Sequence, residues 1–308
     1  MAKNNSGANA NSGNLMLVAA FFAIAIVLVG GGLLLLGGAF SGIGNGCVGL
    51  ISIKGEIMVD DSQAGLFGGG AQGSETIASE IEDAGKRQDV KALVILIDSP
   101  GGSPVASRHI YDALRAVKKP KVAYFREVAA SGGYYVGAGA DYIVSEPDAI
   151  TGSIGVRATI TDLSGLFGKI GYNETVFKSG AMKDIGSSSR PMTEEEKTVL
   201  QSVISETFTE FKNIVLESRG SRLDRAKFEQ VLDARILTGR QALNVGLVDE
   251  LGNQKDAVRK ASVLAGEEKE LPVCEIGEKK KTFLSSLLGD ALQLPSPVAL
   301  LPQWKLWY

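Results

Sequence analysis

Histidine is almost absent from this chain of 308 residues, which contains only His109. A Ser-His-Asp triad would have to use that side chain, with Asp98 or Asp112 as the acidic partner. A single histidine in a predicted helix is more often a surface or packing residue than a catalytic base. The main alternative base is a lysine whose pKa is brought down by burial from its ordinary value of about 10.4.

Cysteine is nearly as scarce, with only Cys47 and Cys274. Two cysteines are too few for a disulfide scaffold or a cysteine-ligated metal cluster. We interpret them as buried thiols, and one bridge between them is the alternative that stays open. The chain also lacks a basic excess, because 32 lysines and arginines stand against 35 acidic residues. We therefore expect no nucleic-acid partner, and we predict no metal or cofactor.

Charged residues are missing between Lys3 and Lys54. Within that span, residues 15–40 are almost entirely apolar, and a bilayer-spanning helix needs roughly 20 such residues. Secretory signal peptides have apolar regions of only about 7–15 residues, and no Ala-x-Ala site follows this one. We predict an uncleaved, single-pass membrane anchor, with cleavage as the alternative. The flanking charge favours the N-terminus inside and the remaining chain outside the cytoplasm.

The composition elsewhere is that of a globular protein, with 44% apolar and 22% charged residues. We predict a polar segment at 1–14 before the anchor and one folded domain at 46–265. A tail at 266–308 follows, basic at first and then apolar and interrupted by prolines. It holds both tryptophans, Trp304 and Trp307, which could lie at a membrane interface or pack against a neighbour.

Short apolar runs predict the strands of a sheet that helices cover on both faces. Residues 91–98 are the clearest case, because only their two end residues are charged. The other predicted strands are 48–54, 121–125 and 142–144. A Gly-rich turn at 99–102 and a helix from about Pro104 to Val117 join two of these strands into a βαβ unit. This order predicts an α/β fold.

Helices are predicted where apolar residues recur at spacings of three and four. The longest covers residues 193–219 and begins with a capping-box pattern at Thr193 and Glu196. Ser74 is the expected cap of a helix over 74–86. Shorter helices are predicted around 222–232, 240–245 and 254–264, and the Gly-rich stretch 60–73 is predicted to be a loop.

One hydroxyl is surrounded by unusually small residues, in the sequence Ala130-Ser131-Gly132-Gly133. A serine that attacks a carbonyl needs small neighbours, so that a peptide can approach and main-chain N–H groups can face the forming oxyanion. The residues from Tyr134 to Ala140 favour a helix start, whose dipole would add to the same site. The alternative is a plain Gly-Ser turn that leads into a tightly packed helix.

Two lysines could supply the base, in the sequence Lys178-Ser-Gly-Ala-Met-Lys183-Asp. This segment follows a strand-like stretch from Glu174 to Phe177. Taken alone, each lysine is most simply a solvated surface charge. A further Gly-Ser turn, Thr151-Gly-Ser153-Ile-Gly-Val156, leads into another predicted strand.

Four ordered motifs together resemble the signal peptide peptidase A proteins, which are membrane-anchored serine proteases of the ClpP/crotonase fold. They are Ser-Pro-Gly-Gly at 99–102, Ala-Ser-Gly-Gly-Tyr-Tyr at 130–135, Thr-Gly-Ser-Ile-Gly-Val at 151–156 and Lys-Ser-Gly-x-x-Lys-Asp at 178–184. The similarity covers about Cys47 to Leu264. It includes a late Asp-Gly-Arg pattern, in which Ala234 replaces the glycine here. The chain is similar to the short form of the family.

The resemblance implies a ClpP/crotonase-like spiral of ββα units behind an N-terminal transmembrane helix. It implies Ser131 as nucleophile, Lys183 as general base, Ser153 as the residue that orients the lysine, and an oxyanion hole at Gly102 and Gly132. The implied activity is an endopeptidase that degrades released signal peptides and other short apolar peptides. The implied assembly is a homo-oligomeric ring with sites shared between subunits. A non-proteolytic crotonase-like or scaffold relative, or a protease of the stomatin-partner type, is the alternative.

Overall fold

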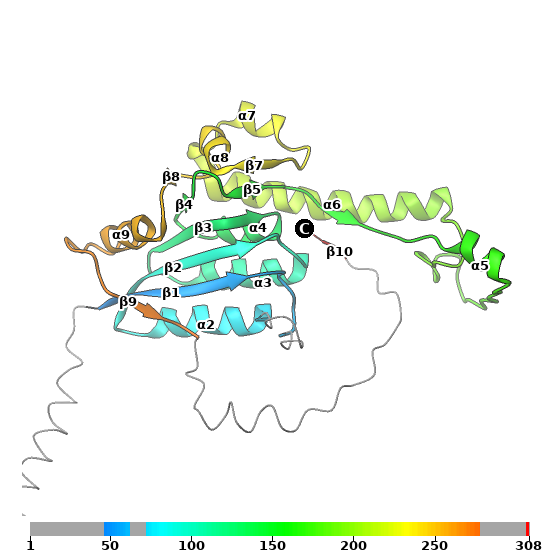
Figure 1. Cartoon of the computed structure of the whole chain (residues 1–308), viewed down its shortest axis with the longest axis horizontal. Coiled ribbons are helices and arrows are strands. Elements are labelled where there is room, and N and C mark those ends of the chain that lie inside the picture. The colour runs from blue at the N-terminus through cyan, green and yellow to red at the C-terminus, as the bar shows by residue number, and fades with distance from the viewer. Residues whose placement is uncertain (1–45, 62–71, 278–305, 308) are drawn as a thin grey trace, which may run out of the picture. The chain divides into compact units, whose positions relative to one another are not determined.

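A computed structural model describes residues 46–61, 72–277 and 306–307 (Figure 1). The chain divides into two units, residues 1–45 and 46–308, and the second unit is described here. The predicted segment 1–14, the predicted anchor 15–40 and most of the tail lie outside the described residues. In the ranges that are described, no helix is both long enough and apolar enough to cross a membrane.

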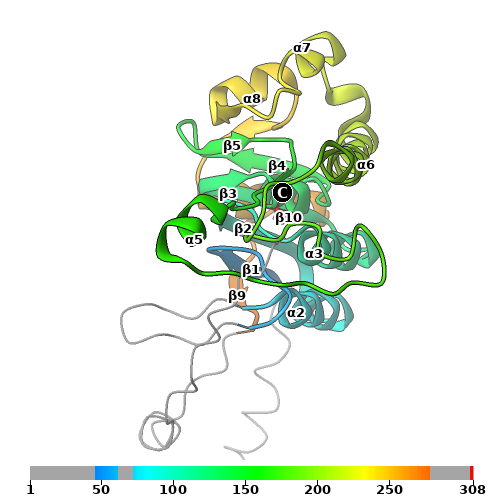
Figure 2. The same ribbon diagram turned by 90° about the vertical axis from the view of Figure 1, so that its right-hand side faces the viewer.

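Eight strands form a mainly parallel sheet at the centre of the described unit (Figure 2). Its main path runs β7 (Ile236–Thr238), β5 (Ile150–Gly152), β3 (Lys121–Ala130), β2 (Val90–Ser99), β1 (Cys47–Lys54) and β9 (Val273–Glu275). In addition, β4 (Tyr142–Ser145) pairs with β3, and β8 (Glu250–Leu251) pairs with β4. Only the β5–β7 pair in this sheet is antiparallel. The predicted α/β class with a parallel sheet is confirmed.

Both faces of the central strands are buried, as the apolar run at 91–98 predicts. In β2, Leu93, Ile95 and Ile97 enter one core cluster, while Ala92, Val94 and Leu96 enter the other. Helices α2 (Ser74–Lys86) and α3 (Pro104–Ala116) supply the first cluster with buried apolar residues. Helix α9 (Gln254–Leu264) covers the opposite face through Ala257, Val258 and Ala261. The alternation of side chains along a strand thus feeds two separate cores.

Several local predictions are confirmed at the helix ends. Helix α6 (Glu194–Arg219) begins with the predicted capping box, because Thr193 Oγ1 accepts from Glu196 N and Glu196 Oε2 accepts from Thr193 N. Ser103 caps α3, and Pro104 occupies the first turn, where its missing N–H costs nothing. The helices at the end of the domain are α8 (Gly239–Val245) and α9, close to their predicted bounds.

Other local predictions are wrong. Ser74 is the first residue of α2 rather than its cap, because Gly73 takes the cap position and donates its N–H to Asp61 Oδ1. The stretch from Glu174 to Phe177 forms no strand and is exposed. The helix predicted at 222–232 is divided into the 3₁₀ turn η1 (Gly220–Arg222) and α7 (Arg225–Gln230).

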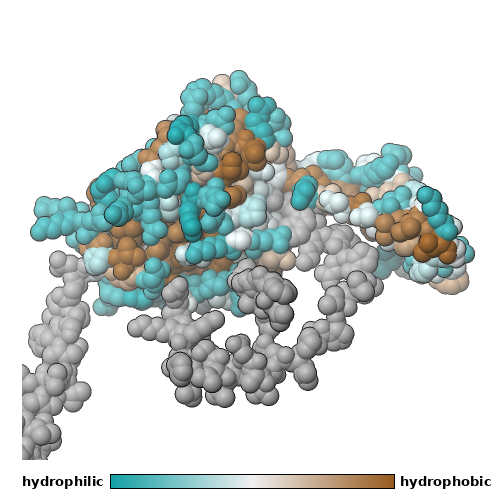
Figure 3. Space-filling model, in the orientation of Figure 1, coloured by the Kyte–Doolittle hydropathy of each residue, from teal (hydrophilic) through white to brown (hydrophobic). Residues whose placement is uncertain are grey.

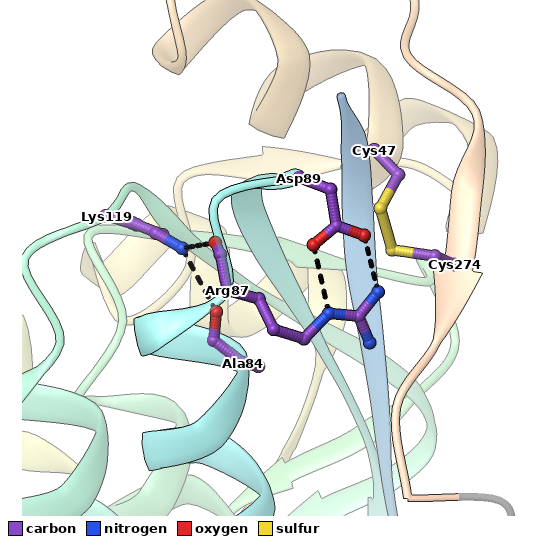
Figure 4. The surroundings of a disulfide bond; sticks show 6 residues. All are labelled: Cys47, Ala84, Arg87, Asp89, Lys119 and Cys274. Atoms are coloured by element: carbon purple, nitrogen blue, oxygen red, sulfur yellow. Dashed lines mark hydrogen bonds and ion pairs between the residues drawn. A yellow bond between two sulfur atoms is a disulfide. The ribbon is translucent and has the colours of Figure 1, made fainter. Parts of the chain in front are cut away.

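The two cysteines form a disulfide between β1 and β9, so their interpretation as separate buried thiols is wrong (Figure 4). The strands run parallel in this region, with Gly49 opposite Cys274, which brings Cys274 close to Cys47. Beside the bond, the Arg87 guanidinium donates twice to Asp89, and Cys47 N donates to Asp89 O at 2.7 Å. The start of β1 is therefore fixed on both sides.

The segment after β5 leaves the sheet and forms an arm, made of residues 157–206, that projects away from it (Figure 1). It includes β6 (Arg157–Ala158), α5 (Ser164–Ile170) and the first half of α6. Helix α5 has no buried residue, and α6 buries mainly Phe211, Ile214, Val215 and Arg219 in its second half. Strand β10 (Leu306–Trp307) pairs antiparallel with β6.

Candidate active site

Ser131 stands at a sharp turn between β3 and α4 (Gly132–Gly137). Its φ is 55° and its ψ is −120°, a left-handed conformation that is costly for a residue with a Cβ. Its N–H donates to Gly152 O at 2.9 Å, which ties the turn to the end of the neighbouring strand β5. Helix α4 begins two residues earlier than predicted, because β3 extends to Ala130 and the chain turns within one residue. The hydroxyl-bearing residue is 5% exposed.

Left-handed backbone angles gather around this turn. Among the described residues, the three non-glycine positions with positive φ are Ser131, Ser153 and Ala234. They lie at the ends of the three neighbouring strands β3, β5 and β7, because Ala130 pairs with Gly152 and Gly152 pairs with Ile236. Ser153 N donates to Arg235 O at 2.9 Å. Strain concentrated in one place is a feature of functional sites, since surrounding contacts must hold it there.

The two predicted oxyanion glycines lie next to each other. A Cβ built on Gly132 would stand 3.1 Å from Gly102 N and would overlap Ser107 Oγ. Gly102 is held by a parallel bridge to Ile57, whose N–H donates to Gly101 O at 2.9 Å and whose carbonyl accepts from Ser103 N at 2.8 Å. Within the described ranges, no acceptor contacts the N–H of Gly102. That amide is therefore available to an incoming oxygen beside the Ser131 turn.

The structure brings Ser131, Ser153, Gly102 and Gly132 together, but it does not bring Lys183 to them within one chain. Lys183 belongs to the segment 171–193 between α5 and α6, and this segment lies at the outer end of the arm, away from the β3–α4 junction (Figure 1). Its side chain is exposed, and no described residue pairs with it. Lys178 differs, because its Nζ donates to Ala181 O and Asp184 Oδ1. Among the described residues, Lys178 therefore has partners for its ammonium and Lys183 has none.

The alternative triad through His109 is not assembled. His109 is exposed on α3. Asp112 pairs with Arg108, and Asp98 accepts from Val128 N and lies 3.7 Å from Arg126. Neither carboxylate that is near it in sequence contacts the imidazole. The histidine is the surface residue that its isolation in the sequence suggests.

Two features of the site were missed from the sequence. Ser107 Oγ is fully buried next to Gly132 and has no hydrogen-bond partner in the described structure. The turn from Asp233 to Arg235 holds Ser153 N, and the Ala234 methyl occupies the space beside Gly155. The Asp-Ala-Arg pattern was a usable signal for the second feature, because it lies in a motif. No local pattern marks Ser107.

Comparison with known proteins now decides the family. The model of peptidase family S49 matches residues 113–268, which is just over half of the chain. The chain belongs to peptidase family S49. The Clp protease model matches residues 72–149, in agreement with the mainly parallel sheet. The S49 match covers the Ser131 turn, the Ser153 turn and the whole arm.

Individual relatives agree with this assignment. A protein of Methanocaldococcus jannaschii that is assigned as a protease is 38% identical over 251 residues, 79% of this chain and 80% of its own. A protein of Enterococcus faecium assigned as signal peptide peptidase SppA is 32% identical over 247 residues, covering 79% and 70%. Protease 4 of Salmonella typhi is 34% identical over 223 residues, which is 71% of this chain but 35% of that longer protein. The chain is a serine peptidase of the signal peptide peptidase A type within S49.

Proposed function

We propose that this peptidase is a membrane-anchored endopeptidase that cleaves short apolar peptides, including released signal peptides, with Ser131 as its nucleophile and Lys183 as its general base. The observation that carries the proposal is the strained Ser131 turn directly beside the amides of Gly102 and Gly132. A left-handed serine between a strand and a helix presents its hydroxyl at the end of the sheet, where a peptide carbonyl can approach.

The proposed reaction proceeds through an acyl-enzyme. Ser131 Oγ attacks the carbonyl carbon while neutral Lys183 Nζ takes the hydroxyl proton. The carbonyl oxygen becomes an oxyanion and accepts from the N–H groups of Gly102 and Gly132. The lysine ammonium then gives its proton to the leaving amine as the C–N bond breaks. Water then attacks the ester carbonyl while the same lysine takes its proton. The lysine ammonium returns that proton to Ser131 Oγ as the ester C–O bond breaks, which releases the acid product and leaves the lysine neutral again.

The base in this proposal comes from a neighbouring subunit. Within one chain, the segment 171–193 that carries Lys183 lies at the outer end of the arm (Figure 1), so a single chain does not complete the dyad. The same arm exposes large apolar residues, among them Phe177 at 94% and Ile170 at 66% (Figure 3). Exposed apolar side chains of this size are typical of interfaces. A head-to-tail contact places one arm against the next subunit, and we propose that the rotation between subunits closes this arrangement into a ring.

A mixture of two inactive variants tests the shared site. Ser131→Ala and Lys183→Ala are each expected to lose activity by at least a hundredfold. If the dyad is built between subunits, co-expression places an intact Ser131 beside an intact Lys183, and part of the activity returns. Fluorophosphonate labelling of Ser131 in the mixture provides a second readout. A mixture that remains inactive, although mixed oligomers are isolated, contradicts the shared dyad.

The proposed substrates are extended, largely apolar peptides with small side chains at the cleaved bond. Support comes from β6, which begins four residues after Ser153 and already pairs with the two-residue strand β10. An edge that accepts one strand can pair with the backbone of a peptide in the same way. A peptide library should show preferred cleavage next to small apolar residues. A strong preference for charged residues at the cut would contradict this.

For localisation, we propose that the catalytic domain lies outside the cytoplasm behind the anchor at 15–40, with the N-terminus inside. The support is the bond between Cys47 and Cys274, because disulfides persist mainly in oxidising compartments. A thiol-reactive probe that does not cross membranes, applied to intact and to lysed cells after reduction, would locate the domain. Labelling that requires lysis would contradict the proposed orientation.

A further inference from the structure

The loop that carries Lys183 is held by a continuous network of charged side chains. Asp184, the next residue, accepts from Arg190 Nε at 3.1 Å and from Arg190 Nη2 at 2.8 Å. Its Oδ1 also accepts from Lys178 Nζ. The carboxylate of Asp184, the residue that follows Lys183, thus connects both ends of the segment 178–190.

The network is anchored to the start of α6. Arg190 donates to both carboxylate oxygens of Glu196, at 2.9 Å from Nη1 to Oε2 and 2.5 Å from Nη2 to Oε1. Glu196 is also the capping-box residue, because its Oε2 accepts from Thr193 N at 2.9 Å. Its side chain is 2% exposed although it belongs to an arm that is mostly open to solvent. A bidentate guanidinium between two carboxylates fixes both distance and orientation.

The backbone of the segment is turned tightly between these anchors. Lys183 N donates to Gly180 O at 3.1 Å, and Ile185 N donates to Met182 O at 3.1 Å. Ser187 N donates to Asp184 O at 3.0 Å. The segment 178–196 is therefore held together by hydrogen bonds and ion pairs along its length, while the Lys183 side chain is exposed and pairs with no described residue. Such rigidity in a loop with so little apolar burial calls for a role beyond local stability.

We infer that Asp184, Arg190 and Glu196 are positioning residues that hold Lys183 in the place where the neighbouring subunit's serine turn can use it. This inference rests on the proposed function of Lys183 as the base. The network touches neither substrate nor the reacting atoms. It acts through the orientation of one side chain, and general-base catalysis depends steeply on that orientation.

The test uses the full-length oligomer with Arg190→Met, which keeps an aliphatic side chain and removes the guanidinium group that binds both carboxylates. We expect kcat to fall about 100-fold with KM changed less than about twofold, because a misplaced base slows chemistry without removing peptide contacts. Arg190→Lys should recover only a small part of kcat, since an ammonium cannot bridge both carboxylates in a plane. Lys197→Met is the matched control. It breaks the exposed pair with Glu194 on the same helix turn and should leave kcat unchanged.

Mixed oligomers then assign the defect to one half of the site. Arg190→Met co-expressed with Ser131→Ala should regain activity, because the second chain supplies a well-held Lys183 and the first an intact Ser131. Arg190→Met with Lys183→Ala should stay low, because both chains then carry a defective lysine side. Equal recovery in both mixtures overturns the inference, and so does a KM increase that accounts for the whole loss in Arg190→Met.

Folding and the proposed function are controlled separately. If Arg190→Met fails to assemble, Glu196→Gln removes one charge of the network with almost unchanged shape and must show the same kcat loss and mixing pattern. If Ser131→Ala with Lys183→Ala never regains activity, the shared dyad fails. The positioning role is then decided by kcat of the unmixed Arg190→Met and Arg190→Lys oligomers, where wild-type kcat in both overturns it.

Discussion

Gly132→Ala should strongly reduce the activity of the enzyme while leaving it folded, because the added methyl group fits the backbone of α4 but not the space around it. Gly132 is the first residue of α4 and has no positive φ, so an alanine is compatible with its backbone. In a helix, alanine is favoured over glycine by about 1 kcal/mol. The added Cβ would nevertheless lie closer to Ser107 Oγ than the 3.0 Å that real Cβ atoms keep.

The size of the effect follows from that overlap. Ser107 is fully buried on α3 and cannot swing into solvent, so α4 and α3 must separate by about 1 Å to restore ordinary contact. The shift moves the amide of Gly132 away from that of Gly102, and a misplacement of about 1 Å costs on the order of a hundredfold in rate. We expect kcat to fall about 100-fold, which corresponds to about 2.7 kcal/mol of transition-state stabilisation.

The assay is a double-mutant cycle on peptide hydrolysis with Ser107→Ala as the second change. Ser107→Ala removes only the overlapping oxygen, which has no partner, so it should leave kcat nearly unchanged and should not lower the melting temperature. Combined with Gly132→Ala, it should restore most of the lost rate, because the remaining contacts of the new Cβ, at 3.1 Å or more, need only small adjustments. A folded Gly132→Ala enzyme with wild-type kcat would refute the reasoning, as would a double variant no faster than Gly132→Ala.

Three further predictions concern the base, the disulfide and the arm. Lys183→Arg should be inactive, because arginine keeps the charge but cannot give up its proton, whereas His109→Ala should stay active. Measurement of kcat for both variants tests this. An active Lys183→Arg with an inactive His109→Ala would instead support a Ser-His-Asp triad. Replacing Cys47 and Cys274 by serine should lower the free energy of unfolding by about 2–4 kcal/mol, because the disulfide restrains a long loop of the unfolded chain. Urea unfolding curves of the variant and the wild type measure this difference, and identical midpoints would contradict it. Arg190 and the N–H of Thr193 lower the pKa of Glu196 to about 2, so its stabilising effect is present above the unfolded value of about 4.3 and is lost as the pH falls toward 2. The melting temperature of wild type should therefore fall more than that of Glu196→Gln between pH 5 and pH 2, and parallel curves would contradict the lowered pKa.

Much of the fold could be predicted because it depends on local patterns. The continuous apolar run at 91–98 requires burial on both faces, and the spacing of Thr193 and Glu196 specifies a cap that needs only four residues. Ser131 could be proposed from its small neighbours, since access to a nucleophile is a property of adjacent side chains.

What could not be predicted depends on contacts between residues that are far apart in the sequence. Cys47 and Cys274 are 227 residues apart, and only the return of β9 beside β1 brings them together. Gly73 rather than Ser74 caps α2 because Asp61, twelve residues earlier, folds back onto its amide. The residues around Lys178 and Lys183 do not by themselves distinguish the two lysines, and only the family motif favours Lys183; in the structure, the contacts of Lys178 with Asp184 and Ala181 separate them.

The disulfide also has a topological consequence for a protease. It closes residues 47–274 into a covalent ring within one chain, distinct from the proposed ring of subunits, and every candidate catalytic residue lies within residues 47–274. A single peptide bond cut inside the ring, by another subunit or by a contaminating protease, opens it but releases no fragment. Such a nicked chain migrates as one piece on a denaturing gel until a thiol reductant is added, and then as two. A chain that is cut once between Cys47 and Cys274 therefore keeps Ser131 and Lys183 in one covalently linked molecule.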